Sequence, residues 1–165
     1  MILPLPLHLF IHFFLAVIIG LLVGRFFNKI TLGLIGGILG GFFIDLDHLL
    51  EYFLVFGPTF NLIYFFQGRE FLVSDQIHTW FHAWEYVPIL FLVAWLFRSW
   101  KSVLTFILAL ALGIFVHLVS DSFINHYPFR NYSLVYRSQL NFSVPLLLSP
   151  EQYQEYIKDR QDLGL

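Results

Sequence analysis

Long apolar runs with almost no charge constrain the fold of this chain more than any other feature. One run extends from about residue 7 to residue 27, and another from Ser102 to about Ile124 contains a single charged residue, Asp121. An α-helix rises 1.5 Å per residue, so roughly 20 apolar residues cross a hydrocarbon core of about 30 Å. Only 12% of the residues are charged, whereas soluble domains carry about 25%. The sequence therefore predicts an integral membrane protein.

Two further apolar stretches complete the predicted architecture, an all-α membrane-embedded four-helix bundle. We expect one membrane domain over residues 1–165, with spans at about 7–27, 30–45, 84–98 and 102–124. Residues 49–66 are apolar but broken by Gly57-Pro58, which favours an interfacial or re-entrant segment. The first twenty residues lack a basic segment and a small-residue cleavage site, so we assign them to the mature chain.

The remaining segments predict two local features. Gly33, Gly37 and Gly41 repeat every four residues, as do Gly36 and Gly40, so the second span offers small-residue faces for close helix packing. In the more polar tail, residues 125–165, Ser149-Pro150-Glu151 has the pattern of the start of a short surface helix.

Basic residues in the two short loops predict an orientation. Arg25 and Lys29 separate the first two spans, and Arg98 and Lys101 separate the last two. Short loops rich in Lys and Arg stay in the cytoplasm, so we expect both termini on the extracytoplasmic side. The net charge of -2 gives no reason to expect a nucleic acid partner.

Ionisable residues gather at the opposite end of the predicted bundle, where all seven histidines of the chain lie. Carboxylates in a membrane are costly unless they are paired, and a divalent metal would turn them into ligands. The chain has no cysteine, so any ligands are imidazole and carboxylate, which suit zinc, iron or manganese. The gathered residues are His8, His12, Asp45, Asp47, His48, His78, His82, Glu85, His117, Asp121 and His126.

The spacing of these residues favours shared faces. His117 and Asp121 are four residues apart, as are His78 and His82, and such pairs lie on one side of a helix. Each feature also has a simpler interpretation. An isolated His–Asp pair can be a hydrogen bond, and His8 and His126 can be interfacial anchors. We assign the carboxylates of Glu51, Glu70 and Asp75 to solvated loops.

These motifs together resemble the YdjM-type, membrane-bound metal-dependent hydrolases. The resemblance covers roughly residues 8–125 and rests on His12 opening the first helix, Asp45-Leu46-Asp47-His48, His78 with His82, and Gly113-x3-His117-x3-Asp121. The segment His78-Thr-Trp-Phe-His82 departs from the family's H-R-G-x-T-H-S pattern. That family is in turn similar to zinc-dependent phospholipase C and P1-type nucleases.

The resemblance implies metal-assisted hydrolysis of a phosphoester on a lipid or lipid-linked substrate. It implies two or more divalent ions, zinc first and manganese or iron as alternatives, with Asp47 and Glu85 in proton transfer. The implied ligands are His12, Asp45, His48, His78, His82, His117 and Asp121.

Other functions stay open at this point. A metal or proton transporter needs polar groups along the membrane depth, and the opposite halves of the spans offer few. A bis-histidine haem protein would not need the three aspartates Asp45, Asp47 and Asp121. A structural membrane protein could use the same residues as a polar cap for a partner, and self-association is compatible with the small-residue faces.

Overall fold

The computed structural model describes residues 5–165 and is helical over that range, with no β-strand among the described residues. The first four residues of the predicted domain lie outside the described residues. Three segments are long and apolar enough to cross a membrane, Pro6–Phe26, Ile30–Phe56 and Lys101–Ile124. The membrane character predicted from the sequence therefore has a structural basis in three helical segments.

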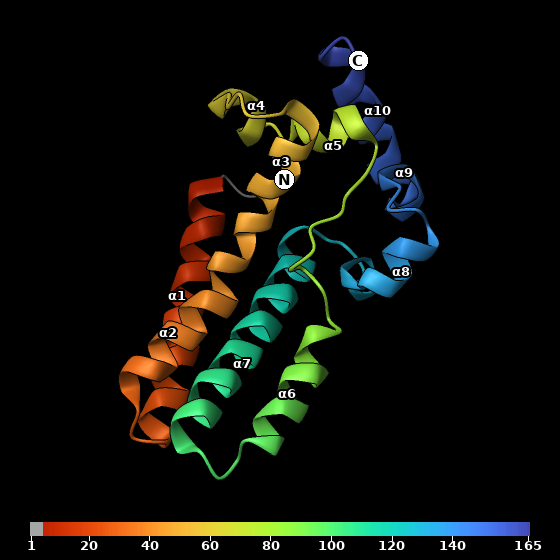
Figure 1. Cartoon of the computed structure of the whole chain (residues 1–165). Coiled ribbons are helices and arrows are strands. Elements are labelled where there is room, and N and C mark those ends of the chain that lie inside the picture. The colour runs from red at the N-terminus through yellow and green to blue at the C-terminus, as the bar shows by residue number, and fades with distance from the viewer. Residues whose placement is uncertain (1–4) are drawn as a thin grey trace.

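Helices α1 (Leu5–Phe26), α2 (Ile30–Gly41) and α7 (Lys101–Ile124) pack against one another as the centre of the molecule. Helix α6 (Tyr86–Leu96) packs chiefly on α7, and Figure 1 shows it running beside the lower half of that helix. The chain passes from α2 through a short 3-10 turn, η1 (Phe43–Asp45), into α3 (Leu46–Phe56), which continues upward from α2 (Figure 1).

The glycines of α2 bring its neighbours into backbone contact, as the four-residue repeat predicts. A methyl group on Gly37 would lie 2.6 Å from the carbonyl oxygen of Ala16 in α1. On the other face of α2, the backbone of Gly40 lies against that of Leu110 in α7. Glycine is required at these positions because any side chain would push the helices apart.

The predicted third span is shorter than expected, so the four-helix membrane bundle is not confirmed. We expected a helix over residues 84–98, but α6 has 11 residues, which rise only about 16 Å. At the start of the predicted span, the backbone N–H of Trp84 donates to the carbonyl oxygen of Tyr132. Further upstream, the side chains of Asp47 and Glu51 accept hydrogen bonds from the backbone N–H groups of residues 78, 79 and 81, and the segment before α6 consists of loop and turns.

The apolar segment 49–66 is interrupted at Gly57, as predicted, because this residue ends α3 with φ of 70°. A short helix, α4 (Leu62–Phe66), follows and begins at Asn61, whose side chain accepts two backbone hydrogen bonds. Aromatic rings of α3 and α4 pack on one another around the buried Tyr52.

The last quarter of the chain folds over the upper end of the bundle. It contains η2 (Phe129–Tyr132), α8 (Leu134–Gln139), α9 (Val144–Leu147) and α10 (Pro150–Asp162). The predicted start of α10 is confirmed, with Ser149 as N-cap and Pro150 at the first helical position. Helix α10 docks on α5 (Arg69–Ser74), where Arg160 and Tyr156 both bind the carboxylate of Asp75.

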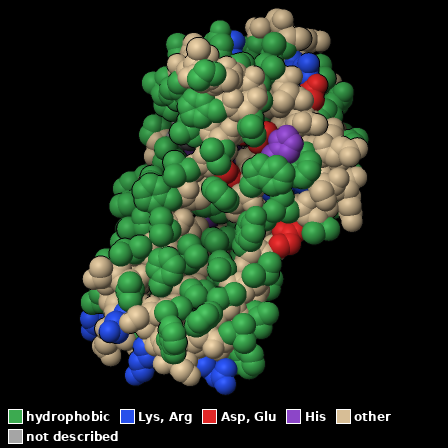
Figure 2. Space-filling view, viewed as in Figure 1, with side chains coloured by type: hydrophobic (Ala, Val, Ile, Leu, Met, Phe, Trp, Pro, Cys, Tyr) green, Lys and Arg blue, Asp and Glu red, His purple; other side chains and the backbone are tan. Residues whose placement is uncertain are grey.

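The molecule is therefore polarised from end to end. Figure 2 shows Lys and Arg side chains at the lower end and a broad hydrophobic surface above them. Asp, Glu and His side chains appear from the middle of this face upward, where a few further Lys and Arg side chains also lie. Both ends of the described chain lie at the upper end (Figure 1).

Candidate metal centre

Two histidines and two aspartates from three segments of the chain meet at the upper end of the bundle. Nε2 of His82 lies 3.0 Å from Nε2 of His117. Oδ1 of Asp45 lies 3.3 Å from the first nitrogen and 3.4 Å from the second. Oδ2 of Asp121 lies 3.5 and 3.3 Å from the same two nitrogens. Ligands at 2.0–2.1 Å from a tetrahedral ion would lie about 3.3–3.4 Å from one another, so each carboxylate oxygen has roughly the spacing of a neighbouring ligand from both nitrogens.

A second group shares the carboxylate of Asp121. Its other oxygen, Oδ1, lies 3.0 Å from Nε2 of His12 and 3.1 Å from Nε2 of His8. The two nitrogens lie 2.7 Å apart, and both residues belong to α1, four positions apart, so they share one helix face. Asp121 thus presents one oxygen to each group.

Three of the four buried imidazoles are oriented by groups that contact their Nδ1 atoms. Nδ1 of His82 lies 2.9 Å from Oδ2 of Asp47, and Nδ1 of His117 lies 3.1 Å from the carbonyl oxygen of Gly41. Nδ1 of His12 lies 3.2 Å from the hydroxyl of Ser120. A carboxylate or carbonyl there accepts Nδ1–H and leaves the Nε2 lone pair facing the cluster, as is usual for metal-binding histidines.

Burial makes this arrangement costly without a cation. His12, His82, His117 and Asp121 are each at most 4% exposed, and Oδ2 of Asp45 and Oδ1 of Asp47 are buried without a hydrogen-bond partner. Several carboxylates and converging nitrogen lone pairs therefore face one another, and buried charge of one sign requires compensation. Protons or metal ions can provide it.

The nearby carboxylates also shift the pKa of His82, which lies outside the spanning helices. Burial lowers this pKa, but the negative charges of Asp47 and Asp45 outweigh the effect of burial and raise the pKa to about 9. The site therefore favours positive charge at the position of this imidazole.

Four groups of three side chains among the described residues could hold a metal ion. They are His8–His12–Asp121, His12–Asp45–His117, Asp45–His48–His82 and His82–His117–Asp121. These groups include six of the seven ligands predicted from the sequence, and they add His8, which we had interpreted as an interfacial anchor.

His78, the remaining predicted ligand, has a different environment. Its Nδ1 lies 2.9 Å from Oε1 of Glu51, and its ring packs on those of Trp80 and Phe142. His78 belongs to none of the four groups, so its role as a ligand stays a prediction.

Glu85, predicted to act in proton transfer, hydrogen-bonds the start of α8. Its carboxylate accepts hydrogen bonds from the hydroxyl of Ser133 and from the backbone N–H groups of Leu134 and Val135. These contacts lower its pKa against the opposing effect of burial. Asp47, the other predicted proton-transfer residue, instead contacts the cluster directly through His82.

Two residues that sequence reasoning missed hold the loop that carries His82. Glu51 is 2% exposed, not solvated as expected, and accepts hydrogen bonds from the backbone N–H groups of His78 and Thr79. Arg137 is 1% exposed and donates to the carbonyl oxygens of Thr79 and His82. The spacing of Glu51 four residues after Asp47 offered a signal, whereas nothing in the local sequence marks Arg137.

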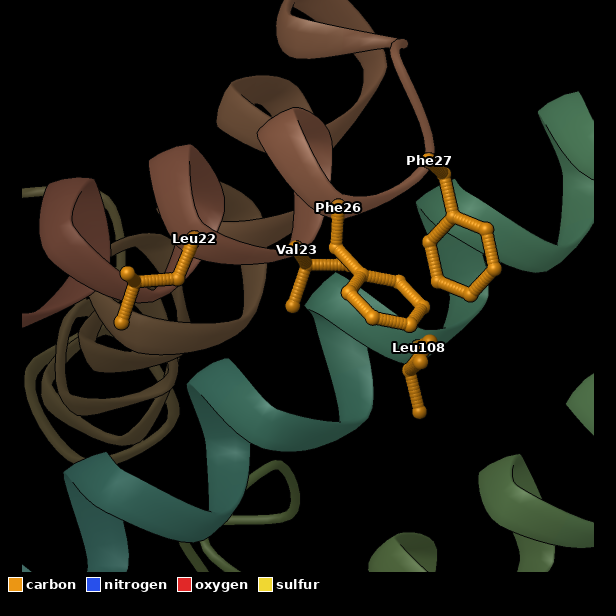
Figure 3. A pocket seen from close by; sticks show the side chains of 5 residues that line it. All are labelled: Leu22, Val23, Phe26, Phe27 and Leu108. Atoms are coloured by element: carbon orange, nitrogen blue, oxygen red, sulfur yellow. The ribbon is translucent and has the colours of Figure 1, made fainter.

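An apolar pocket of about 230 Å³ lies at the other end of the bundle. Figure 3 shows its lining side chains, Leu22, Val23, Phe26 and Phe27 of α1 and the following turn, with Leu108 of α7. Ten residues of helix separate Leu22 from His12, about 15 Å. The residues that line this pocket include no ionisable group.

The chain matches no family model, no curated protein and no solved structure.

Proposed function

We propose that this chain is a membrane-embedded metal-dependent hydrolase that cleaves a phosphoester of a lipid or lipid-linked substrate. One observation carries the proposal: two imidazole nitrogens lie 3.0 Å apart, and a carboxylate oxygen from each of two aspartates lies 3.3–3.5 Å from both nitrogens. The resemblance of the motifs to the YdjM-type hydrolases agrees with this assignment but is independent of the distances.

Zinc is the metal that the donor set fits best. Imidazole and carboxylate without thiolate also suit manganese and iron, but the tetrahedral spacing is the one that zinc adopts most readily. The carboxylate of Asp121 faces both groups of nitrogens, which supports two ions held by one shared ligand. His82, His117, Asp45 and Asp121 would hold one ion, and His8, His12 and Asp121 would contribute to the other.

The depth of the cluster supports a lipid substrate. Asp45 lies 15 residues above the start of α2, and His117 lies 16 residues above the start of α7, which places both about 22–24 Å from the lower end. The hydrocarbon core of a bilayer is about 30 Å thick. With the lower end at one membrane surface, the cluster lies near the opposite surface, where ester and phosphate groups of lipids are found.

The basic loops support a sidedness for this arrangement. Arg25, Lys29, Arg98 and Lys101 flank the lower ends of the helices, and such loops remain cytoplasmic. We therefore assign the cluster and both termini to the extracytoplasmic side.

The chemistry follows from what each part supplies. Bound divalent ions would polarise the phosphoryl oxygens and lower the pKa of water to about 7. Asp47 orients the ring of His82, and the carbonyl oxygen of Gly41 orients that of His117. Asp121 contacts both groups of histidines, through His12 on one side and His117 on the other. The apolar lower halves of the helices offer no continuous polar path, which favours a hydrolase over a transporter.

Elemental mass spectrometry on detergent-purified protein tests the proposal, beside a His117→Ala/Asp121→Ala variant. We expect about two zinc ions per wild-type chain, loss of most of this metal in the variant, and wild-type release of product from lipid phosphodiesters. A folded wild-type protein that binds no divalent metal would overturn the assignment. Metal binding without hydrolysis of any phosphoester would leave a metal-binding membrane protein and remove the hydrolase.

A further inference from the structure

Glu51 and His78 form an acid–imidazole pair that lies outside the four groups able to hold a metal ion. Oε1 of Glu51 lies 2.9 Å from Nδ1 of His78, while Oε2 accepts the backbone N–H groups of His78 and Thr79. The side chain of Glu51 is 2% exposed and that of His78 is 24% exposed. A buried carboxylate thus holds a partly exposed imidazole by one ring nitrogen.

Aromatic neighbours fix the plane of the same imidazole. The ring of His78 stacks on Trp80 at a centroid distance of 5.5 Å and packs on Phe142 at 4.8 Å. Trp80 and Phe142 also contact each other, at 5.6 Å. The three rings therefore pack against one another, and Nε2 is the ring nitrogen of His78 that Glu51 does not contact.

The position of His78 follows from the way its loop lies along α3. Asp47 holds Phe81 and His82, whereas Glu51, one helical turn further along α3, holds His78 and Thr79. One turn of helix is about 5.4 Å, so His78 lies roughly that far beyond His82. Because α3 runs away from the lower end of the bundle, His78 is on the aqueous side of the cluster.

We propose that His78, held by Glu51, protonates the oxygen that leaves on the head-group side of a lipid phosphodiester. The role rests on the proposed hydrolase function and adds the proton donor and the cleaved bond. The distance of one helical turn suits a side chain that touches the leaving oxygen while the phosphoryl group lies at the cluster.

The proposed step balances as follows. The oxygen of a water molecule bonds to phosphorus, and the water loses a proton to the solvent. The bond between phosphorus and the head-group oxygen breaks, and its electron pair stays on that oxygen. The proton on Nε2 of His78 moves to the same oxygen, and the exposed side of the ring recovers a proton from solvent. The products are a lipid that keeps its phosphate and a free head-group alcohol.

The test compares two lipid phosphodiesters that share one diacylglycerol moiety and differ in the head group, ethyl or 4-nitrophenyl. Ethoxide needs a proton to leave, whereas 4-nitrophenolate does not. General acid catalysis contributes about 10²–10⁴-fold, so His78→Gln should slow ethyl ester cleavage by at least ~100-fold and the nitrophenyl ester by less than ~10-fold. Metal content, measured on the same samples, should equal that of the wild type.

Two further variants sharpen the comparison. His126→Gln alters an exposed histidine at the same end of the molecule and should change neither rate. Glu51→Gln should give the same dependence on the head group with a smaller loss, and it decides the question if His78→Gln does not fold.

Each alternative result would overturn the proton-donor role. Equal losses on both esters would make His78 a structural residue, and loss of an ion in His78→Gln would make it the metal ligand predicted from the sequence. Release of diacylglycerol by the wild type would mean that the leaving oxygen is on the other side of phosphorus. A wild-type protein that holds metal and cleaves neither ester would end the proposed function and this role with it.

Discussion

At the scale of single residues, Asp47 and Glu85 show how position decides the role of a carboxylate. Both were predicted to act in proton transfer. Asp47 contacts Nδ1 of His82 and the backbone N–H of Phe81, whereas Glu85 accepts hydrogen bonds from the first residues of α8. Only the first of these carboxylates can influence a metal ion through its contact with a ligand.

Asp47→Asn should therefore weaken metal binding while Glu85→Gln leaves it unchanged. Loss of a carboxylate that orients a metal-binding histidine costs about 10–100-fold in affinity. Titration against a zinc-competing chelator measures the affinity, and thermal unfolding shows whether each variant remains folded. Wild-type affinity in Asp47→Asn, or metal loss in a folded Glu85→Gln protein, would contradict the roles assigned from the contacts.

Individual residues also show where sequence reasoning succeeds and where it ends. His117 and Asp121 share a helix face because their spacing fixes it, and the four-residue glycine repeat of α2 correctly predicts close helix packing. Arg137 contacts a carbonyl group 55 residues earlier in the chain. No local pattern encodes such a contact, so the support of the His82 loop could not be predicted from the sequence.

At the scale of elements, the packing of α2 determines whether the cluster can assemble. Gly37 contacts the backbone of α1, and Gly41 supplies the carbonyl oxygen that faces Nδ1 of His117 in α7. Helix α6 is shorter than the predicted span of residues 84–98. Its apolar composition suits a longer helix, but the backbone N–H of Trp84 donates to the distant carbonyl oxygen of Tyr132, and the helix begins two residues later.

Gly37→Ala should separate α1 from α2 and destabilise the protein by about 1–3 kcal/mol, the usual cost of overpacking. Metal content should fall as well, because His12 moves with α1. Thermal unfolding in detergent measures the first effect and elemental analysis the second. Leu39→Ala is the matched control, since this α2 residue is 42% exposed. Equal behaviour of the two variants would show that the tight helix contact is not needed.

At the scale of the whole molecule, stability depends on the region that folds over the bundle. Glu70 of α5 is 1% exposed, and one of its oxygens is buried without a hydrogen-bond partner. Burial raises the pKa of this carboxyl from 4.5 to about 7, and the charge of Glu51 adds to the shift. The folded protein therefore keeps a proton that the unfolded chain loses above pH 4.5.

The sign of the resulting pH dependence follows from this difference in bound protons. The protonated carboxyl of Glu70 contributes about 3 kcal/mol to the free energy of unfolding. This contribution is fully present below about pH 4.5 and is lost as the pH rises through 7. Glu70→Gln should raise the unfolding temperature at pH 8 by about 5 °C and change it little at pH 5. Glu155→Gln, at an exposed position of α10, is the control. An equal shift at both pH values would contradict the buried, protonated carboxyl.

The hydrogen bonds from Arg137 to the His82 loop also determine when this loop can take its final position during biosynthesis. Helices α1 and α2 end at least 96 residues before Arg137, so both can enter the membrane before this side chain exists. Until Arg137 reaches the carbonyl oxygens of Thr79 and His82, the loop that delivers His82 lacks its anchor. A cluster that needs His82 in place can therefore form only after the C-terminal region of the chain has been made.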